Sequence, residues 1–576
     1  MPHSFKRAAS FKRAASTLCL SMMLAANGPL SALAGPQEEA LRTATPIKHL
    51  VIIFGENESF DHYFGTYPHA TNPPGEPAFT AKRDTPAVNG FTAELLNNNP
   101  NLNPANGTGA TNPFRLDRSQ AHTSSQNHAY GPEQAAFDDG KMDLFPLNTG
   151  AAGTGGTGVF NTKGLVMGYY DGNTVTALWN YAQHFAMSDN SYSSTFGPSS
   201  PGAINLISGQ TNGAVGHAPS NGSSTNTINN IVADGQGGFT MYGDSDPFGD
   251  VCSSTTSATT EMTGKNIGDL LNARNISWGW FEGGFDLTAT NPNGTTGCNR
   301  SSTSAVVGSN VKDYVPHHQP FQYYASTRNV SHTRPTSVAA IGTSFDGGAN
   351  HQYDTNDFIA AVQAGNLPAV SFLKAPAIQD AHPSNSDPLD EQVFVVNMIN
   401  MLQKSPEWKS TAVIIAYDDS DGWYDHAHMV INPSHSAQDD FTAAQNCTPL
   451  PGTHGALSTP LPGLNGQPVQ GRCGYGPRQP LLVISPFAKR NFVDHTLTDQ
   501  SSILRFVEDN WLNGERIGQG SFDAIAGKID SMFDFDHKSD RKLFLDPNLG
   551  TVVNSDHDDH DHDHDRADRD HGGSRI

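Results

Sequence analysis

The chain has 576 residues, a length that suits one large α/β domain or two to four smaller ones. Hydrophobic residues make up 36% of it, and its 56 glycines and 37 prolines indicate long loops in a globular chain, which excludes a fibrous or disordered protein. The formal net charge of -23 argues against a nucleic acid as the main partner, because proteins that bind a phosphate backbone usually carry a basic stripe.

Residues 1–34 have the pattern of a secretory signal peptide. A positively charged stretch comes first, an apolar run follows, and the small-residue sequence ALA at 32–34 is typical of a cleavage site. A membrane anchor is the alternative, but the apolar run is short and is broken by "NGP" at 27–29. We therefore expect an exported protein, periplasmic or secreted, with a linker at 35–46 and no integral membrane segment in the mature chain.

Removal of the signal peptide leaves four cysteines in the mature chain, Cys252, Cys298, Cys447 and Cys473. An even number of cysteines in an exported chain indicates disulfides. Proximity in the sequence favours the pairs Cys252–Cys298 and Cys447–Cys473, although four cysteines allow three different pairings. None of the four has the spacing of a metal ligand.

Four apolar, β-branched runs predict buried strands at 49–54, 368–373, 411–417 and 480–485. Helical patterns lie at 390–404 and 499–511. The alternation of strands and helices predicts an α/β fold with a mostly parallel central sheet and helices on both faces. In such sheets ligands bind beyond the carboxyl ends of the strands, so the residues after each strand are candidates for a site.

Two polar segments, 70–160 and 210–310, are rich in Asn, Gly, Thr and Ser, and we interpret them as long loop insertions around the core. The last segment, 546–576, contains the Asp- and His-rich sequence "DHDDHDHDHDRADRDH" and is predicted to be disordered, because it cannot bury a core. This tail could bind divalent cations, or it could be a solvated tail without a further role.

Polar residues follow two of the predicted strands directly. Glu56 and Asn57 end the first strand, and Asp418 and Asp419 end the third. An adjacent pair of acids is usually a turn or a helix cap. Two strand ends with oxygen ligands favour a site for a hard or borderline divalent metal ion instead, because a cation relieves the repulsion between the acids.

Further candidates lie in loops marked by proline or glycine. Ser199 stands between Gly-Pro and Pro-Gly, and a serine beside a metal ion can act as a nucleophile. The loop histidines that could move protons or bind phosphate are His128, His317, His318 and His382. The sequence contains no Gly-x-Ser-x-Gly nucleophile elbow, P-loop or dinucleotide fingerprint.

Together these motifs resemble the bacterial phosphoesterase family, which contains secreted phospholipases C and acid phosphatases. The matching segments are "HLVIIFGENESFDHYFGTYP", "NHAYGPEQAAFDDGKMD", "SDNSYSSTFGPSSPG", "PHHQPFQYY", "AHPSNSD", "IIAYDDSDGWYDH" and "PLLVISPFAK". They occur in the order of the family and cover about 47 to 511. The resemblance implies a phosphoesterase catalytic domain at 47–545 with a fold similar to the alkaline phosphatase superfamily.

The resemblance also implies roles for individual residues. Glu56, Asn57, Asp418, Asp419 and Ser199 match the positions that bind one divalent metal ion, whose identity stays open, and Ser199 matches the nucleophile. The four histidines match those that line the phosphate pocket. Asp61 is expected to support its loop, and the residues expected to orient the ligands are Asp421, Asp425 and His426.

The implied reaction is hydrolysis of a phosphate ester through a phosphoserine. Phosphocholine-cleaving members of the family often carry additional C-terminal β domains, whereas about 65 residues follow the last motif here. This favours an acid-phosphatase-like phosphomonoesterase. The alternative is a phospholipase C that cleaves the phosphodiester bonds of zwitterionic phospholipids, and the remote alternative is a secreted, non-catalytic protein that binds a metal or a sugar.

Overall fold

The computed structural model describes residues 42–154, 156–222, 230–427, 461–537 and 539–553, which belong to one compact unit. The predicted signal peptide at 1–34 and the start of the linker at 35–46 lie outside the described residues. So does Cys447, and with it the predicted pair Cys447–Cys473.

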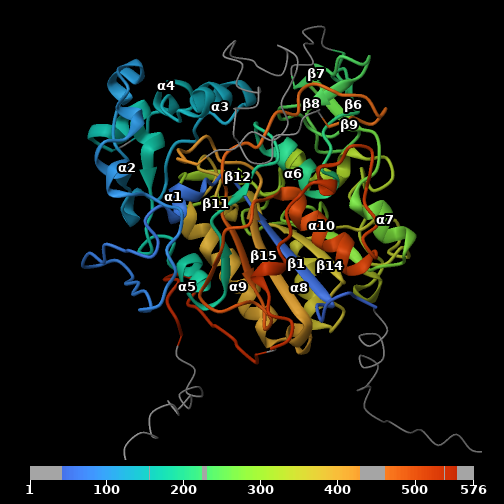
Figure 1. Cartoon of the computed structure of the whole chain (residues 1–576). Helices are drawn as coiled ribbons and strands as arrows, with labels where there is room; N and C mark the ends of the chain where they lie inside the picture. Colours follow the sequence, from blue (N-terminus) through green and yellow to red (C-terminus); the bar gives the residue numbers. More distant parts are fainter. Residues whose placement is uncertain (1–41, 155, 223–229, 428–460, 538, 554–576) are drawn as a thin grey trace, which may run out of the picture. The chain divides into compact units, whose positions relative to one another are not determined.

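Eight strands form the central sheet (Figure 1). They are β1 (His49–Gly55), β4 (Ala186–Ser188), β10 (Trp278–Glu282), β13 (Gln352–Asp354), β14 (Val370–Lys374), β15 (Thr411–Tyr417), β16 (Leu481–Ile484) and β17 (Phe492–Asp494). Their order is β13-β10-β14-β1-β15-β16-β4-β17, and β1 pairs in parallel with both β14 and β15. Strand β16 runs antiparallel to its neighbours β15 and β4. The predicted mostly parallel sheet is confirmed.

α-Helices pack around the central sheet and help to bury its strands. They are α1 (Phe60–Phe64), α2 (Ala93–Asn97), α3 (Tyr130–Phe137), α4 (Phe145–Asn148), α5 (Thr176–His184), α6 (Ser199–Ser208), α7 (Ile267–Ala273), α8 (Thr355–Gln363), α9 (Pro388–Lys404) and α10 (Gln500–Trp511). Helix α6 packs against α10, and α5 packs against α9 (Figure 1). Since every residue of β1 and β15 is buried, side chains on both faces of the sheet are covered.

Local sequence explains where the predicted helices begin. The carboxylate of Asp387 accepts hydrogen bonds from the first backbone N–H groups of α9, and Pro388 occupies the first helical position. Helix α10 begins after Asp499, which forms a capping box with Ser502. Both helices lie within two residues of the ranges predicted from the sequence.

The two polar segments differ from one another. The first, 70–160, holds α2, α3, α4 and the short strand β2 (Phe114–Arg115), and its helices lie at the upper left in Figure 1. The second, 210–310, carries small two-stranded sheets but also β10, which is part of the central sheet. The interpretation of 210–310 as an insertion is therefore wrong at Trp278–Glu282. The sequence "WGWFE" lacks the β-branched residues that marked the other strands.

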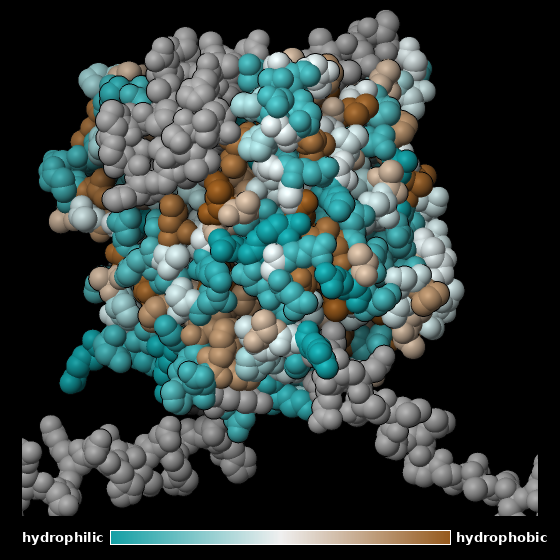
Figure 2. Space-filling model, turned by 45° about the vertical axis from the view of Figure 1, so that its right-hand side comes forward, coloured by the Kyte–Doolittle hydropathy of each residue, from teal (hydrophilic) through white to brown (hydrophobic). Residues whose placement is uncertain are grey.

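The remaining strands are short and lie outside the central sheet. They are β3 (Gly168–Tyr169), β5 (Ser191–Tyr192), β6 (Ala214–His217), β7 (Ile231–Ala233), β8 (Phe239–Met241), β9 (Thr259–Met262), β11 (Ser301–Ser304), β12 (Ser309–Lys312) and β18 (Thr498–Asp499). On the face that Figure 2 shows, hydrophobic residues lie scattered among hydrophilic ones, while the apolar side chains of the main strands are inside.

The disulfide Cys252–Cys298 is present, as proximity in the sequence predicted. The disordered tail was predicted to start at residue 546, and this is wrong for residues 546–553. Leu545 and Val552 form an antiparallel bridge, and the backbone N–H of Asp546 donates to the carbonyl of Thr551. The rest of that tail lies outside the described residues. Among the helices described, none has the length and apolar character needed to cross a bilayer.

Candidate active site

The four acidic and amide residues predicted as metal ligands lie side by side at the carboxyl ends of two neighbouring strands. They are Glu56, Asn57, Asp418 and Asp419, and each is at most 1% exposed. Because β1 and β15 are parallel and Gly55 pairs with Tyr417, the residues that follow the two strands meet at one edge. The backbone N–H of Asn57 donates to Asp418 Oδ1 over 3.1 Å.

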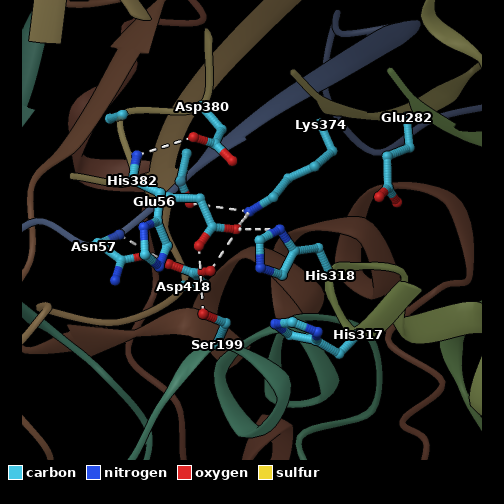
Figure 3. Close-up of polar contacts among 12 residues, drawn as sticks. Glu56, Asn57, Ser199, Glu282, His317, His318, Lys374, Asp380, His382 and Asp418 are labelled. Atoms are coloured by element: carbon cyan, nitrogen blue, oxygen red, sulfur yellow. Dashed lines mark hydrogen bonds and ion pairs between the residues drawn. The ribbon is translucent and has the colours of Figure 1, made fainter. Parts of the chain in front are cut away.

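Ser199 is brought to these carboxylates by α6, of which it is the first residue. Its Oγ lies 3.0 Å from Asp419 Oδ2 and 3.3 Å from Glu56 Oε2 (Figure 3). Two glycines allow this approach. Gly197 has φ +113°, which strains any other residue, and a Cβ on Gly202 would lie 2.0 Å from the carbonyl oxygen of Asp418. Helix α6 therefore packs directly on the loop that follows β15.

The donor set fits a divalent metal ion. Burial raises the pKa of both Glu56 and Asp419, and the neighbouring charge of Asp418 raises it further, so a cation beside these carboxylates would be stabilised. The amide nitrogen of Asn57 donates to Asp421 Oδ1 over 3.0 Å, whereas its buried Oδ1 has no hydrogen-bond partner among the described residues. Carboxylate and amide oxygens are ligands of hard and borderline divalent ions. Asp421 thus contacts a predicted ligand, as expected.

Glu133, in α3, joins the turn before Ser199 to the loop that follows β15 and was missed by sequence reasoning. Its Oε2 accepts the backbone N–H of Gly197 over 2.8 Å, and its Oε1 accepts the hydroxyl of Ser420 over 2.8 Å. Burial raises the pKa of Glu133 to about 7. The residue lies within the motif "NHAYGPEQAAF", but a glutamate in a helix carries no signal that it will contact a distant turn.

Two further buried ionisable residues were also missed, Lys374 and Asp380. Lys374 is the last residue of β14, and its Nζ contacts Glu56 Oε1 and lies 3.4 Å from Asp418 Oδ2. Burial raises the pKa of Asp380 to about 8. The rule that strand ends carry ligands could have found Lys374, but the strand was predicted to end at 373 and the search was for oxygen ligands.

The adjacent histidines of the predicted phosphate pocket differ in environment. His318 is 4% exposed, and its Nδ1 lies 3.0 Å from Glu56 Oε1. Burial lowers its pKa well below the usual value, and the charge of His317 adds to this. His317 is more exposed. Burial acts to lower its pKa, but the carboxylate of Asp246, 3.4 Å from its Nδ1, outweighs this and raises the pKa. His317 therefore keeps a proton more readily than His318.

The other two histidines lie beside each other, with ring centroids 6.3 Å apart. The Nδ1 of His128 lies 3.1 Å from Asp421 Oδ1, and the carboxylates of Asp419 and Asp421 raise the pKa of His128 against the opposing effect of burial. His382 accepts from Ser384 over 2.9 Å, and burial lowers its pKa to about 4. Figure 3 shows His317, His318 and His382 around Glu56, Asp418 and Ser199.

A second group of buried or half-buried charged residues has its acids after β1 and β15, and we name it the scaffold cluster. It consists of Asp61, Asp425, His426 and Arg478. The Arg478 guanidinium lies 3.0 Å from Asp61 Oδ1 and 3.2 Å from Asp425 Oδ2, and the Nδ1 of His426 lies 2.6 Å from Asp61 Oδ2. Asp61 thus holds its loop, as expected. Asp425 and His426 contact Asp61 and not the predicted metal ligands.

Comparison with known proteins assigns the family. Residues 47–512 match the model of the phosphoesterase family, and the chain belongs to this family. It is similar to the non-hemolytic phospholipase C of Pseudomonas aeruginosa, with 25% identity over 515 residues that cover 88% of this chain and 60% of that protein. It is also similar to phospholipase C A of Mycobacterium tuberculosis, with 22% identity over 525 residues that cover 88% of this chain and 81% of the relative.

The chain spans about three fifths of the length of the Pseudomonas relative. Among solved structures, a protein in the alkaline phosphatase superfamily from Vibrio parahaemolyticus matches with 11% identity over 74% of this chain and 80% of its own. Its TM-score of 0.24 is too low to support an argument about the fold. The family resemblance read from the motifs is confirmed by the family model, over nearly the range that the motifs covered.

Proposed function

We propose that this protein is a metal-dependent hydrolase of phosphoric esters that acts through a phosphoserine at Ser199, and that its substrates are phosphodiesters of the phospholipid type. Membership of the phosphoesterase family supports ester hydrolysis. The names of the relatives favour the phospholipase C alternative over the acid-phosphatase-like phosphomonoesterase that the sequence alone ranked first. A phospholipase C that this chain matches over 81% of its length weakens the argument from missing C-terminal domains.

One observation carries the proposal: Ser199 Oγ lies within hydrogen-bonding distance of two buried carboxylates at the ends of β1 and β15. The ligands of one divalent ion would be Glu56, Asn57, Asp418, Asp419 and Ser199. When bound, the ion would supply Lewis-acid stabilisation of the serine oxygen and of the phosphoryl group.

The residues of the chain account for the remaining chemistry. Asp419 and Glu56 orient the Ser199 hydroxyl, and Asp419, which accepts its hydrogen bond, takes its proton. The serine oxygen attacks phosphorus, forms a P–O bond and expels the lipid alcohol, so that the head-group phosphate stays esterified to Ser199 as a phosphoryl-serine. His128 and His317, whose neighbouring carboxylates raise their pKa, bind the equatorial oxygens, and one of them protonates the leaving alcohol. Water then cleaves the bond between phosphorus and the serine oxygen, releases the head-group phosphate and returns the proton to the serine.

Export to the periplasm or beyond the cell is part of the proposal and is supported by the signal-peptide pattern at 1–34. The substrate is a phosphate ester with a neutral or zwitterionic head group, because a chain with a net charge of -23 is repelled by anionic lipid surfaces.

The test uses one preparation and two chromogenic substrates, p-nitrophenyl phosphorylcholine and p-nitrophenyl phosphate. We expect faster turnover of the diester, and a clear preference for the monoester would restore the phosphomonoesterase prediction. Ser199→Ala should abolish turnover and the acid-stable phosphoserine trapped after a quench. Ser200→Ala is the matched control, and it should still form the phosphoserine. No turnover with any divalent ion would favour the non-catalytic binding protein.

A further inference from the structure

We propose that Lys374 is a built-in cation of the active site that completes its charge balance and restricts it to a single divalent ion. The inference rests on the proposed function, in which the carboxylates after β1 and β15 hold that ion. Lys374 would act through Glu56 as a positioning residue and would not touch the reacting phosphorus.

The place of Lys374 is fixed by the sheet. Strand β14 pairs in parallel with β1, so its last residue lies beside the end of β1. The side chain is 1% exposed. Its Nζ contacts Glu56 Oε1, lies 3.4 Å from both Asp418 Oδ2 and the carbonyl oxygen of Gly55, and lies 5.3 Å from the ring centre of Phe54 (Figure 3). The ammonium is therefore held between the two strand ends.

Lys374 and the nucleophile contact different oxygens of the same carboxylate. Ser199 Oγ lies 3.3 Å from Glu56 Oε2, whereas Lys374 and His318 contact Glu56 Oε1, the latter at 3.0 Å. The ammonium thus fixes the orientation of Glu56 and leaves Oε2 on the side of the nucleophile. This arrangement supplies positive charge without occupying the space beside Ser199.

The charges of the site balance when Lys374 is counted. Three buried carboxylates, those of Glu56, Asp418 and Asp419, would face one divalent ion and one ammonium. An unbalanced charge in such a buried place is costly, because neither water nor a partner stabilises it. Loss of the ammonium would leave one excess negative charge, which a further cation can relieve.

Ligands for a second cation are already in place around Lys374. Ligand atoms of Glu56, His318 and Asp380 lie within 4.8 Å of one another, and all three side chains are buried. The Oδ2 of Asp380 has no hydrogen-bond partner in the part of the chain that the structure describes. Lys374 contacts the same Glu56 Oε1 that would serve this ion. The ammonium and a second metal ion therefore exclude one another.

The experiment counts metal ions per protein with Mn²⁺ as the probe. Wild type and variants are equilibrated with Mn²⁺, dialysed, and measured by plasma mass spectrometry. The Asp- and His-rich tail is present in every variant, so the counts are compared with that of wild type. We expect the wild-type count in Lys374→Arg, which keeps the charge, and one further ion in Lys374→Met. The double variant Lys374→Met with Asp380→Asn should return to the wild-type count. A folded Lys374→Met with the wild-type count would overturn the inference.

If Lys374→Met does not fold, the wild-type protein still tests whether the active site holds a single ion. Electron paramagnetic resonance of Mn²⁺-loaded wild type at saturating metal should show isolated ions, and the spectrum of an exchange-coupled pair would refute the single-ion limit. Failure of the proposed function is distinguishable from failure of this inference. In the first case Ser199 forms no phosphoserine while the metal counts hold, and in the second the phosphoserine forms but the counts differ.

Discussion

Two groups of buried carboxylates follow β1 and β15, and they differ in how their charge is balanced. The first, which we name the site cluster, consists of Glu56, Asp418 and Asp419, and Lys374 is the cation that contacts it among the described residues. The scaffold cluster pairs Asp61 and Asp425 with a guanidinium and an imidazole. The same strands thus deliver acids to two neighbouring places, and only in the site cluster do the carboxylates outnumber the cations that contact them.

The pKa values differ within each cluster. In the site cluster burial raises the pKa of Asp419, whereas burial of Asp418 is outweighed by Lys374, which holds the pKa of Asp418 below its usual value. In the scaffold cluster burial of Asp61 is outweighed by His426 and Arg478, which hold its pKa below the usual value, while burial raises the pKa of Asp425 to about 6. The ratio of carboxylates to cations, and not the pKa of any single acid, therefore distinguishes the candidate metal site from the salt-bridge network.

The largest effect is expected from breaking the scaffold cluster. Arg478→Met leaves two buried carboxylates without their main partner and should lower the free energy of unfolding by about 3–5 kcal/mol. Denaturant unfolding measures this. Arg274→Met is the control, because it removes only the exposed pair with Glu515 and should cost less than about 1 kcal/mol. Equal losses in the two variants would contradict the assigned roles.

A change in the site cluster should lower activity and leave the stability of the fold unchanged or higher. Asp419→Asn removes an acid whose pKa burial raises, despite the nearby His128, so the metal-free protein should be at least as stable as wild type. Activity should fall about 100-fold, or ~2.7 kcal/mol in the barrier, because a predicted metal ligand is lost. The measurements are thermal unfolding in a chelator and kcat/KM with the phosphodiester. A destabilisation as large as that of Arg478→Met would remove the distinction between the clusters.

Glu133 links the site to its surroundings and should give an intermediate effect. The side chain of Glu133→Gln has one acceptor oxygen, which can accept either the N–H of Gly197 or the hydroxyl of Ser420. Both contacts persist only if the Ser420 hydroxyl rotates, so the turn before Ser199 is held less firmly. We expect kcat to fall about tenfold while the bound metal per protein stays unchanged. Metal loss in this variant would instead place Glu133 among the residues that maintain the ligands.

The smallest effect concerns a carboxyl pair away from both clusters. Ile517 donates its N–H to Glu508 over 3.0 Å and to Asp523 over 2.9 Å, and burial raises the pKa of Glu508 to about 9. The folded state therefore binds this proton more tightly, so stability falls as the pH rises from about 5 through 9. Glu508→Gln, which also loses the charge that pairs with Arg516, should gain stability relative to wild type as the pH rises from 5 to 9, by at least about 1 kcal/mol. Parallel curves of melting temperature against pH would contradict this.

The sequence predicted the parts of the site that follow from strand order. Continuous apolar runs marked β1 and β15, and the acids after each strand then had to meet because parallel strands share an edge. Ser199 needed the family resemblance, since a serine between two turns carries little signal by itself. The antiparallel direction of β16 could not be predicted, because an apolar run is the same in either direction.

Glu133 and the contacts of Lys374 could not be predicted for a different physical reason. They depend on elements far apart in the chain, and a glutamate in a helix or a lysine at a strand end is common. Strand β10 was missed because "WGWFE" combines aromatic residues with a glycine and resembles a polar insertion at its flanks. Local patterns therefore pointed to candidate ligands but not to the residues that contact them.

The contact of Gly202 with the loop after β15 has a consequence for engineering. Ser199, the predicted nucleophile, and the predicted ligands after β15 lie on two elements whose close packing leaves no room for a Cβ on Gly202. A side chain at Gly202 would force α6 and this loop apart and would change the distance from Ser199 to the carboxylates without altering any reacting atom. A displacement of about 1 Å suffices to lose much of the rate. Gly202 is thus a spacer, and exchanges of α6 between related proteins will succeed only where this spacing is kept.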